Sequence, residues 1–488
     1  MPLSLIPWPS SAADLPALPH RAGTGTRGEA LGRVLADAMH VARALGGAGD
    51  PDGFGPEGYY LRADESGVVI ASATTAGAFY AEQTLAQLLT PTDDGWIVPA
   101  VEIRDEPRFA HRGVMLDVAR SFHPVTTVEG LIDRAASLKL NALHLHLTDD
   151  QGWRLELASH PELVREGSGS QVGGTGGGHY SRDDYRRIVE YAAARHITVI
   201  PEIDVPGHTH ALGLSHPELS ADPVLSDHIM EVVRDHGGGT PTRGEAYTGL
   251  AVGFSSLRAD AAGLDAFLEE VFGELAALTP GPYLHFGGDE ALGTSDADYA
   301  DLVGRISRIV AASGKTPIAW HEAGAADTAP GTIGQFWGFL DPDPDHVSRT
   351  LALVERGGRV ILSPADAVYL DMKYDEATRA GLVWANGPTS VRRSYEWEPS
   401  DVVPGLPDEA IAGVEACVWT ETIPDAATLD EMAFPRIGAA AEAAWSGPLG
   451  SAQRDWESFR RRAAALAPAW SDAGIGSFAS PEIGEPKP

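Results

Sequence analysis

The hydrophobic residues of this chain follow two different patterns, and the change between them falls near residue 105. Up to that point, apolar positions at helical spacing alternate with short apolar runs bounded by turn residues, which is typical of a small mixed domain. The segments predicted there are helices over 29–45 and 74–89 and strands over 59–62, 68–70 and 96–103. The charged stretch Arg104-Asp105-Glu106-Pro107 follows the last of them. We therefore expect an N-terminal α+β domain over residues 1–105.

Beyond this boundary, short apolar runs alternate with amphipathic helices. The runs that predict strands cover 113–118, 142–147, 197–203, 283–286, 317–320, 333–337, 360–362 and 414–419. One helical stripe between them is formed by Val128, Leu131, Ile132, Ala135 and Leu138. Eight strand–helix units predict an α/β fold, a (β/α)8 TIM barrel that occupies residues 106–488 together with a C-terminal helical segment. An open, doubly wound sheet has the same periodicity and stays an alternative.

Polar and aromatic residues gather where the predicted barrel strands end. The groups in question are Thr148-Asp149-Asp150, Asp204-Val205-Pro206-Gly207-His208, Gly287-Gly288-Asp289-Glu290, Trp320, Trp337 and Trp419. Barrel enzymes carry their active sites at the C-terminal ends of the strands. We therefore expect these side chains to form one functional site.

Asp289 and Glu290 are the most informative pair in this set. Two successive residues of a regular strand face opposite sides, but Gly287 and Gly288 let the backbone bend so that both carboxylates face one ligand. A pair of acidic residues that stabilises the start of a helix is the structural alternative. Tryptophan rings beside carboxylates favour a ligand with apolar C–H faces and hydroxyl groups, which describes a sugar.

Composition excludes several classes of partner. Asp and Glu number 69 against 36 Lys and Arg, and the formal net charge is -33. Such a field repels phosphate backbones and anionic lipid, so we expect no nucleic acid and no membrane partner. Cys417 is the one cysteine of the sequence, which rules out an intrachain disulfide and a structural zinc site built on cysteines.

The sequence contains no run of apolar residues long enough to predict a transmembrane helix. Its first residues have neither the basic region nor the long apolar region of an export signal. We expect a cytoplasmic location for the chain as given, and secretion if a leader has been removed from it.

Two histidine pairs are candidate metal ligands, His144-x-His146 and His208-x-His210. His144 and His146 alternate with leucines inside the second predicted strand, so both point into the barrel, and hydrogen-bonded core histidines are favoured there. His208 lies just past a strand end and is a better candidate for the functional site.

Glycine-rich segments have structural explanations as well. Gly23-Thr24-Gly25-Thr26-Arg27-Gly28 matches the dinucleotide fingerprint, but two prolines precede it, no strand is predicted there and no βαβ unit follows, so we interpret it as a loop before a helix. Residues 167–178 lack the ending of a phosphate-binding loop and predict a mobile loop near the barrel mouth.

Several of these segments together resemble glycoside hydrolase family 20, the β-N-acetylhexosaminidases, and specifically the bacterial exo-acting members. The segments that carry the resemblance are Leu116–Arg120, His144–Arg154, Pro201–His208, His285–Glu290, Tyr369–Asp371 and Trp419–Glu421. The resemblance covers nearly the whole chain.

The resemblance implies a role for each of twelve residues. Glu290 would be the general acid and base, and Asp289 would orient and stabilise the substrate's acetamido group. The implied substrate-binding residues are Arg120, Asp371 and Glu421 at the sugar hydroxyls, Tyr369 at the acetamido carbonyl, Trp320, Trp337 and Trp419 as walls, Trp384 on the leaving-group side, and Asp149 with His208 as a pair that supports Glu290.

The resemblance also implies the reaction, which is removal of terminal N-acetyl-β-hexosamine (GlcNAc or GalNAc) with retained configuration. In this family the acetamido oxygen of the substrate attacks C1 and forms an oxazolinium ion, an exception to the scheme with two catalytic carboxylates. No metal and no organic cofactor is expected. The preference between gluco and galacto configuration, the natural glycan and the oligomeric state stay open.

Two other functions remain as alternatives at this point. One is a metal-dependent barrel hydrolase that uses the His-x-His pairs. The other is a catalytically silent sugar-binding protein, against which the intact Asp289-Glu290 pair argues.

Overall fold

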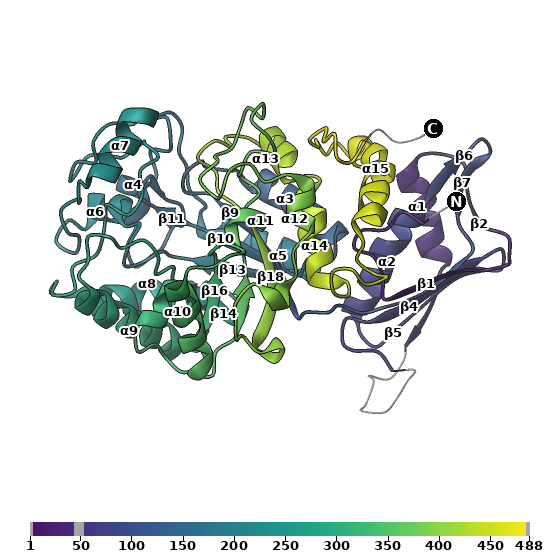
Figure 1. The fold of residues 1–488 in the computed structure, drawn as a ribbon, viewed down its shortest axis with the longest axis horizontal. Helices are drawn as coiled ribbons and strands as arrows, with labels where there is room; N and C mark the ends of the chain where they lie inside the picture. Colours follow the sequence, from purple (N-terminus) through teal and green to yellow (C-terminus); the bar gives the residue numbers. More distant parts are fainter. Residues whose placement is uncertain (1–2, 43–52, 485–488) are drawn as a thin grey trace.

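A closed barrel of eight parallel strands forms the larger part of the structure, a computed structural model that describes residues 3–42 and 53–484 (Figure 1). In barrel order the strands are β9 (His111–Asp117), β10 (Ala142–His146), β13 (Thr198–Glu202), β14 (Tyr283–His285), β15 (Thr316–Trp320), β16 (Ile333–Phe336), β17 (Val360–Leu362) and β18 (Ile411–Val418). Because β18 pairs with β9, the sheet closes on itself. The predicted barrel is confirmed, and the open sheet is excluded.

Helices cover the outside of the barrel between successive strands. They are α3 (Val125–Ser137), α5 (Arg182–Ala193), α8 (Leu264–Leu278), α9 (Asp296–Ala312), the short η1 (His321–Ala325), α10 (Pro344–Glu355), α11 (Ala365–Val368), α12 (Val391–Tyr395), η2 (Pro399–Asp401) and η3 (Asp408–Ala410). The predicted stripe of α3 is buried, with Val128 and Ile132 fully inaccessible. Three further helices, α13 (Ala426–Ala433), α14 (Arg436–Trp445) and α15 (Trp456–Asp472), follow the last strand.

Two insertions lengthen the loops after the second and third barrel strands. They contain β11 (Thr148–Asp149), β12 (Gly152–Trp153), α4 (Glu162–Gly167), α6 (His210–Ser215) and α7 (Asp227–His236). Helices α4 and α6 pack against each other. Figure 1 shows this region at one end of the long axis and the N-terminal domain at the other.

The described residues of the N-terminal domain form two sheets and two helices. The larger sheet has the order β1 (Ser11–Asp14), β8 (Val101–Asp105), β4 (Tyr59–Asp64), β5 (Gly67–Ser72), β3 (Met39–Ala42); the smaller one contains β2 (His20–Gly23), β7 (Gly95–Val98) and β6 (Thr90–Thr92). The helices are α1 (Arg27–Asp37) and α2 (Thr75–Leu88).

Three details of this domain correct the sequence predictions. The helix predicted over 29–45 ends at Asp37, residues 39–42 form strand β3 beside β5, and residues 43–45 lie outside the described residues. The strand predicted over 96–103 is divided between the two sheets, because Pro99 cannot donate a backbone hydrogen bond. Residues 20–23 do form a strand, which pairs antiparallel with β7. Of the glycine-rich segment, only residues 24–26 form the expected loop, because Gly23 ends β2 and Arg27 and Gly28 begin α1.

A buried polar cluster joins the two domains. Asp105 of β8 accepts hydrogen bonds from Lys139 Nζ at 2.9 Å and from Trp445 Nε1 at 2.9 Å. Tyr59 O–H also donates to Asp105, at 2.7 Å. Lys139 and Trp445 belong to the barrel and are 2% and 1% exposed, so the contact fixes the N-terminal domain to the barrel.

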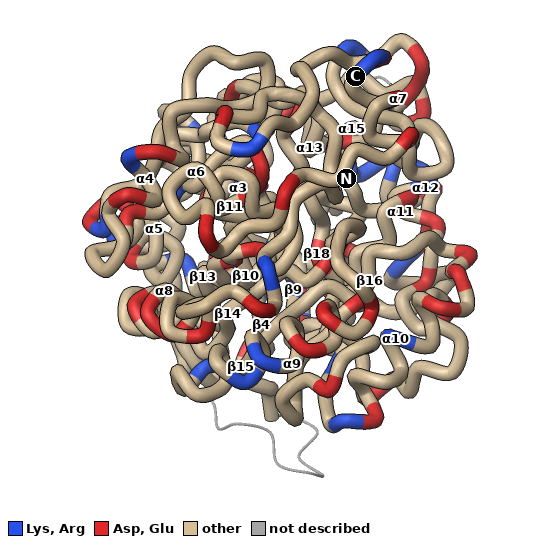
Figure 2. The backbone as a smooth tube through the Cα atoms, turned by 90° about the vertical axis from the view of Figure 1, so that its left-hand side faces the viewer, with Lys and Arg blue, Asp and Glu red and all other residues tan. Residues whose placement is uncertain are grey.

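The acidic residues are spread over many elements rather than gathered in one segment, as the colours along the backbone in Figure 2 show. Among the described residues, no helix is both long enough and apolar enough to cross a membrane.

Candidate active site

The chain turns sharply after β14 and brings the two acidic residues together. Gly287 and Gly288 have φ angles of 71° and 97°, in the left-handed region that glycine adopts without strain. Glu290 also has a positive φ, 45°, so the two carboxylates do not alternate as they would in a strand. His208 Nε2 lies 3.5 Å from Asp289 Oδ2 and 3.5 Å from Glu290 Oε2. Helix α9 begins only at Asp296, capped by Ser295, which excludes the pair as acids of its first turn.

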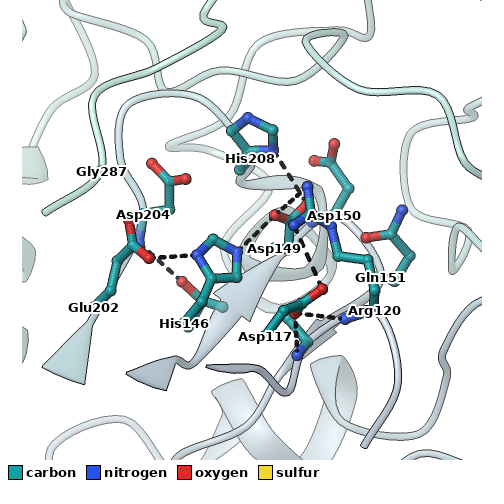
Figure 3. Close-up of polar contacts among 12 residues, drawn as sticks. Asp117, Arg120, His146, Asp149, Asp150, Gln151, Glu202, Asp204, His208 and Gly287 are labelled. Carbon is teal, nitrogen blue, oxygen red and sulfur yellow. Dashed lines mark hydrogen bonds and ion pairs between the residues drawn. The ribbon is translucent and has the colours of Figure 1, made fainter. Parts of the chain in front are cut away.

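His208 links this pair to a buried chain of charges. Its Nδ1 lies 3.2 Å from Asp149 Oδ1, and Arg120 Nη2 lies 2.8 Å from Asp149 Oδ2; Figure 3 shows the three side chains in line. Burial opposes the charge on His208, but Asp149, Asp289 and Asp204 raise its pKa well above the usual value. His208 is therefore an imidazolium that faces both Asp289 and Glu290.

Several buried polar groups around the site have atoms without a hydrogen-bond partner in the part of the chain that the structure describes. Among them are Nε and Nη1 of Arg120, Oδ1 of Asp289, Oδ2 of Asp371, Nε2 of His208 and Oδ2 of Asp204. Unpaired polar atoms are costly in a protein interior, so their grouping at one barrel end indicates a polar ligand. Burial and Glu421 raise the pKa of Asp371, and burial raises that of Glu421 to about 7.

An aromatic wall adjoins these polar groups. The ring centroids of Trp320 and Trp419 are 6.0 Å apart, and those of Tyr369 and Trp419 are 6.1 Å apart. Trp384 continues the wall, at 5.8 Å from Tyr369 and 6.1 Å from Trp337. Trp320 is buried whereas Trp384 is 46% exposed, so the wall runs from the barrel interior to its rim.

Comparison with known proteins agrees with this geometry. The model of the glycosyl hydrolase family 20 catalytic domain matches residues 109–297 and 294–448, and that of the family's domain 2 matches residues 14–106.

The chain belongs to glycosyl hydrolase family 20.

Individual relatives cover most of the chain. A β-N-acetylhexosaminidase of Cellulomonas fimi is 43% identical over 89% of this chain and 82% of its own length. A solved family 20 β-N-acetylglucosaminidase is 52% identical, covers all of both chains and has a TM-score of 0.90. The Streptomyces plicatus N-acetyl-β-hexosaminidase, solved in complex with Thio-NAglucal, is 40% identical over 99% of this chain and 98% of its own, with a TM-score of 0.87.

Three acidic residues near the site of this glycoside hydrolase were given no role by the resemblance. Glu322 on η1 accepts hydrogen bonds from Trp337 Nε1, at 3.0 Å and 3.1 Å to its two oxygens. Burial and the nearby Asp289 raise its pKa to about 8. Asp204 accepts from the backbone N–H of Gly288 at 3.2 Å, and Asp117 accepts from the backbone N–H groups of Ala119, Arg120 and Thr420. Each lies at or just after the end of a barrel strand, which was the signal that identified the other site residues.

In this family 20 chain, His144 and His146 are buried inside the barrel, and their ring nitrogens are already occupied by carboxylates. His144 contacts Glu415 at 2.9 Å and Glu202 at 3.1 Å. His146 contacts Asp149 at 2.8 Å and also Glu202 (Figure 3). Burial opposes their charge, but the carboxylates, Glu202 foremost, raise the pKa values of His144 and His146 to about 9 and about 10. A protonated ring has no free lone pair for a metal. The ring of His210 points away, to the carbonyl oxygen of Glu245 at 2.7 Å.

The glycine-rich loop 167–178 lies at the barrel mouth, as predicted. Buried Arg154 donates hydrogen bonds to the carbonyl oxygens of Ser168, Ser170 and Gly178. Val172 N–H donates to the carbonyl oxygen of Arg120 at 2.9 Å. The loop therefore supports the backbone of a site residue.

Proposed function

We propose that this chain is an exo-acting β-N-acetylhexosaminidase that releases terminal non-reducing N-acetyl-β-hexosamine with retained configuration. The acetamido oxygen of the substrate would be the nucleophile. The observation that carries the proposal is the bend after β14, which turns Asp289 and Glu290 toward the same imidazolium, His208, at 3.5 Å each. Two adjacent carboxylates on one side of a bond can divide the work, one as proton donor and one as charge stabiliser.

Glu290 would protonate the glycosidic oxygen as the bond to C1 breaks, and would then take a proton from water. Its side chain is 32% exposed, so a leaving group and a water molecule can both reach it. The adjacent His208, held by Asp149, stabilises the carboxylate that remains after the proton has left. General acid catalysis of this kind contributes about 10²–10⁴-fold to the rate.

Asp289 would hold the amide N–H of the substrate while its carbonyl oxygen attacks C1. One of its oxygens already faces His208, and the other, Oδ1, has no partner among the described residues. That free oxygen can accept the amide N–H and stabilise the positive charge of the oxazolinium ion. The hydroxyl group of Tyr369, in the aromatic wall, would donate a hydrogen bond to the acetamido oxygen.

Arg120, Asp371 and Glu421 would bind the outer hydroxyls of the terminal sugar. Arg120 and Asp371 are buried and Glu421 is partly buried, and the Arg120 guanidinium lies over the Trp419 ring at 4.7 Å from its centroid. The buried end of the barrel thus accepts a single sugar ring, while exposed Trp384 at the rim offers a face to the leaving group. This arrangement favours exo-action on GlcNAc or GalNAc termini.

The test is turnover of three nitrophenyl β-glycosides by the purified protein: the N-acetylglucosaminide, the N-acetylgalactosaminide and the plain glucoside. We expect rapid release from at least one N-acetylated substrate, very slow release from the glucoside, and no loss of activity after chelation. No turnover of any substrate would favour a silent sugar-binding protein. Activity that is lost on chelation and restored by zinc or manganese would favour the metal-dependent hydrolase.

A further inference from the structure

The pentapeptide Ser-His-Pro-Glu-Leu occurs twice in the chain, at 159–163 and at 215–219. The fold brings the histidines of the two copies together outside the barrel, at α4 and at the end of α6, in the region that Figure 1 shows farthest from the N-terminal domain. The rings of His160 and His216 have centroids 5.3 Å apart, and both pack against Phe267 of α8. None of these residues takes part in the proposed reaction.

A single carboxylate oxygen lies between the two rings. Glu162 Oε1 is 3.3 Å from His160 Nδ1 and 3.3 Å from His216 Nε2. Around a tetrahedral zinc ion with bonds of about 2.0–2.1 Å, neighbouring ligand atoms lie about 3.3–3.4 Å apart. The two distances from Glu162 Oε1 match this separation, and all three ligand atoms lie within 4.8 Å of one another.

The second nitrogen of each ring lies near an oxygen atom. His216 Nδ1 is hydrogen-bonded to Ser215 Oγ at 2.9 Å, and His160 Nε2 lies 3.0 Å from Glu270 Oε2 without the alignment of a hydrogen bond. An oxygen beside the far nitrogen favours the ring proton there and leaves the near nitrogen free to bind a metal.

The group is open enough for an ion to enter. The side chains of His160, Glu162 and His216 are 14%, 29% and 12% exposed. Solvent can therefore deliver the ion and provide the remaining ligand as water. The net charge of -33 attracts cations to this surface.

We propose that His160, Glu162 and His216 form a binding site for one divalent transition-metal ion of the zinc class. Two imidazoles and one carboxylate suit Zn²⁺, whereas Mg²⁺ and Ca²⁺ prefer oxygen ligands alone. The ion ties α4 to the end of α6, and α6 begins two residues after His208. The role is structural, and the proposal does not depend on the proposed function.

The test is calorimetric titration of the chelator-stripped full-length protein with zinc chloride, repeated with magnesium chloride. We expect about one zinc ion per chain, a visible absorption band of tetrahedral type when Co²⁺ replaces zinc, and a higher midpoint of thermal unfolding with zinc. Magnesium should produce none of these effects. Absence of zinc binding by the wild-type protein would overturn the proposal without affecting the assigned enzymatic activity.

Variants separate this site from zinc bound elsewhere. His160→Gln/His216→Gln should lose the bound ion and the thermal shift, whereas His228→Gln/His236→Gln, which changes two exposed histidines of α7, should keep both. Glu270→Gln, with the ligands intact, should weaken zinc binding by roughly 10-fold or more. Equal binding by the ligand variant and the α7 variant would place the ion at another site and contradict the proposal.

Discussion

At the scale of single residues, the buried carboxyl groups of the active site lie in opposite electrostatic surroundings. Burial opposes ionisation of Asp149, but Arg120 and His208 lower its pKa. Burial and Asp289 instead raise the pKa of Asp204, and the same two causes raise that of Glu322 to about 8. Environments that separate the pKa values of neighbouring acids allow one to stay charged while another carries a proton. Asp149 thus anchors the charge of His208, and Glu322 is a neutral neighbour of Asp289 at neutral pH.

Glu290→Gln tests the proton donor. The amide keeps the size of the side chain but has no carboxyl proton to give, so we expect kcat/KM for a natural disaccharide to fall by about 10²–10⁴-fold. Nitrophenolate departs without protonation, so the first step with nitrophenyl substrates should slow much less. Steady-state kinetics measure kcat/KM for the disaccharide, and burst kinetics measure the first step with nitrophenyl substrates. If both rates fall by the same factor, Glu290 is not the acid.

Glu322→Gln tests the protonation of Glu322. A native pKa of about 8, above the usual value near 4.5, means that the folded state binds this proton more tightly than the unfolded state. The stability that results is complete below about pH 4.5 and is lost as pH rises through about 8. The glutamine has no such loss, so relative to wild type it should gain about 1 kcal/mol or more between pH 5 and pH 9.

Urea denaturation at pH 5, 7 and 9 measures this gain. The matched control is Glu355→Gln, which changes an exposed glutamate at the end of α10. A stability difference between Glu322→Gln and wild type that is the same at all three pH values would contradict the assignment.

At the scale of elements, the bend after β14 is the feature that makes the site. A Cβ atom at Gly287 would lie 1.6 Å from Asp204 Oδ1, and its φ is 71°. Gly287→Ala therefore combines backbone strain with a clash, and we expect the carboxylates to move and kcat to fall by about 10²-fold or more. Gly314→Ala is the matched control, because φ there is 85° but no atom lies within 4 Å of the added Cβ.

Nitrophenyl assays with thermal unfolding distinguish the two glycine variants. The control should lose about 1 kcal/mol of stability through its positive φ and keep its kcat. If Gly287→Ala keeps wild-type kcat, the tight turn does not position the carboxylates.

The eight barrel strands were predictable because strands buried on both faces form continuous apolar runs. The wrong predictions concern segments whose structure is decided by pairing with a neighbouring strand and not by the local sequence pattern. Residues 39–42 form a strand because β5 lies beside them, and residues 20–23 because β7 does. Glu322 was missed although it follows Trp320 by two residues, because its place beside Trp337 depends on the next barrel strand.

At the scale of the whole molecule, a buried ion pair contributes to the contact between the N-terminal domain and the barrel. Lys139 Nζ donates to Asp105 at 2.9 Å and to Tyr59 at 2.8 Å. Lys139→Met leaves Asp105 buried without its counter-charge, which costs about 3–5 kcal/mol. Denaturant unfolding should show this loss, and Asp105→Asn added to Lys139→Met should restore part of it. An unchanged midpoint for Lys139→Met would mean that the pair does not hold the domains together.

The sequence predicted two domains but gave no sign of how they meet, since Asp105, Lys139 and Trp445 come from three distant segments. The same holds for His160 and His216, whose pentapeptides lie 56 positions apart. Contacts of this kind follow from the closed barrel, and only the three-dimensional structure shows them.

In the proposed mechanism, the substrate's acetamido oxygen, and not an enzyme carboxylate, attacks C1. The most direct test of this step is kcat/KM for nitrophenyl glucosaminides whose N-acyl group is acetyl, fluoroacetyl, difluoroacetyl or trifluoroacetyl. Each fluorine withdraws electrons from the carbonyl oxygen and weakens it as a nucleophile. We predict a steep, stepwise fall of kcat/KM along the series. A kcat/KM that does not change with fluorine, accompanied by a glycosyl adduct on Asp289 in mass spectra taken during turnover, would contradict the account.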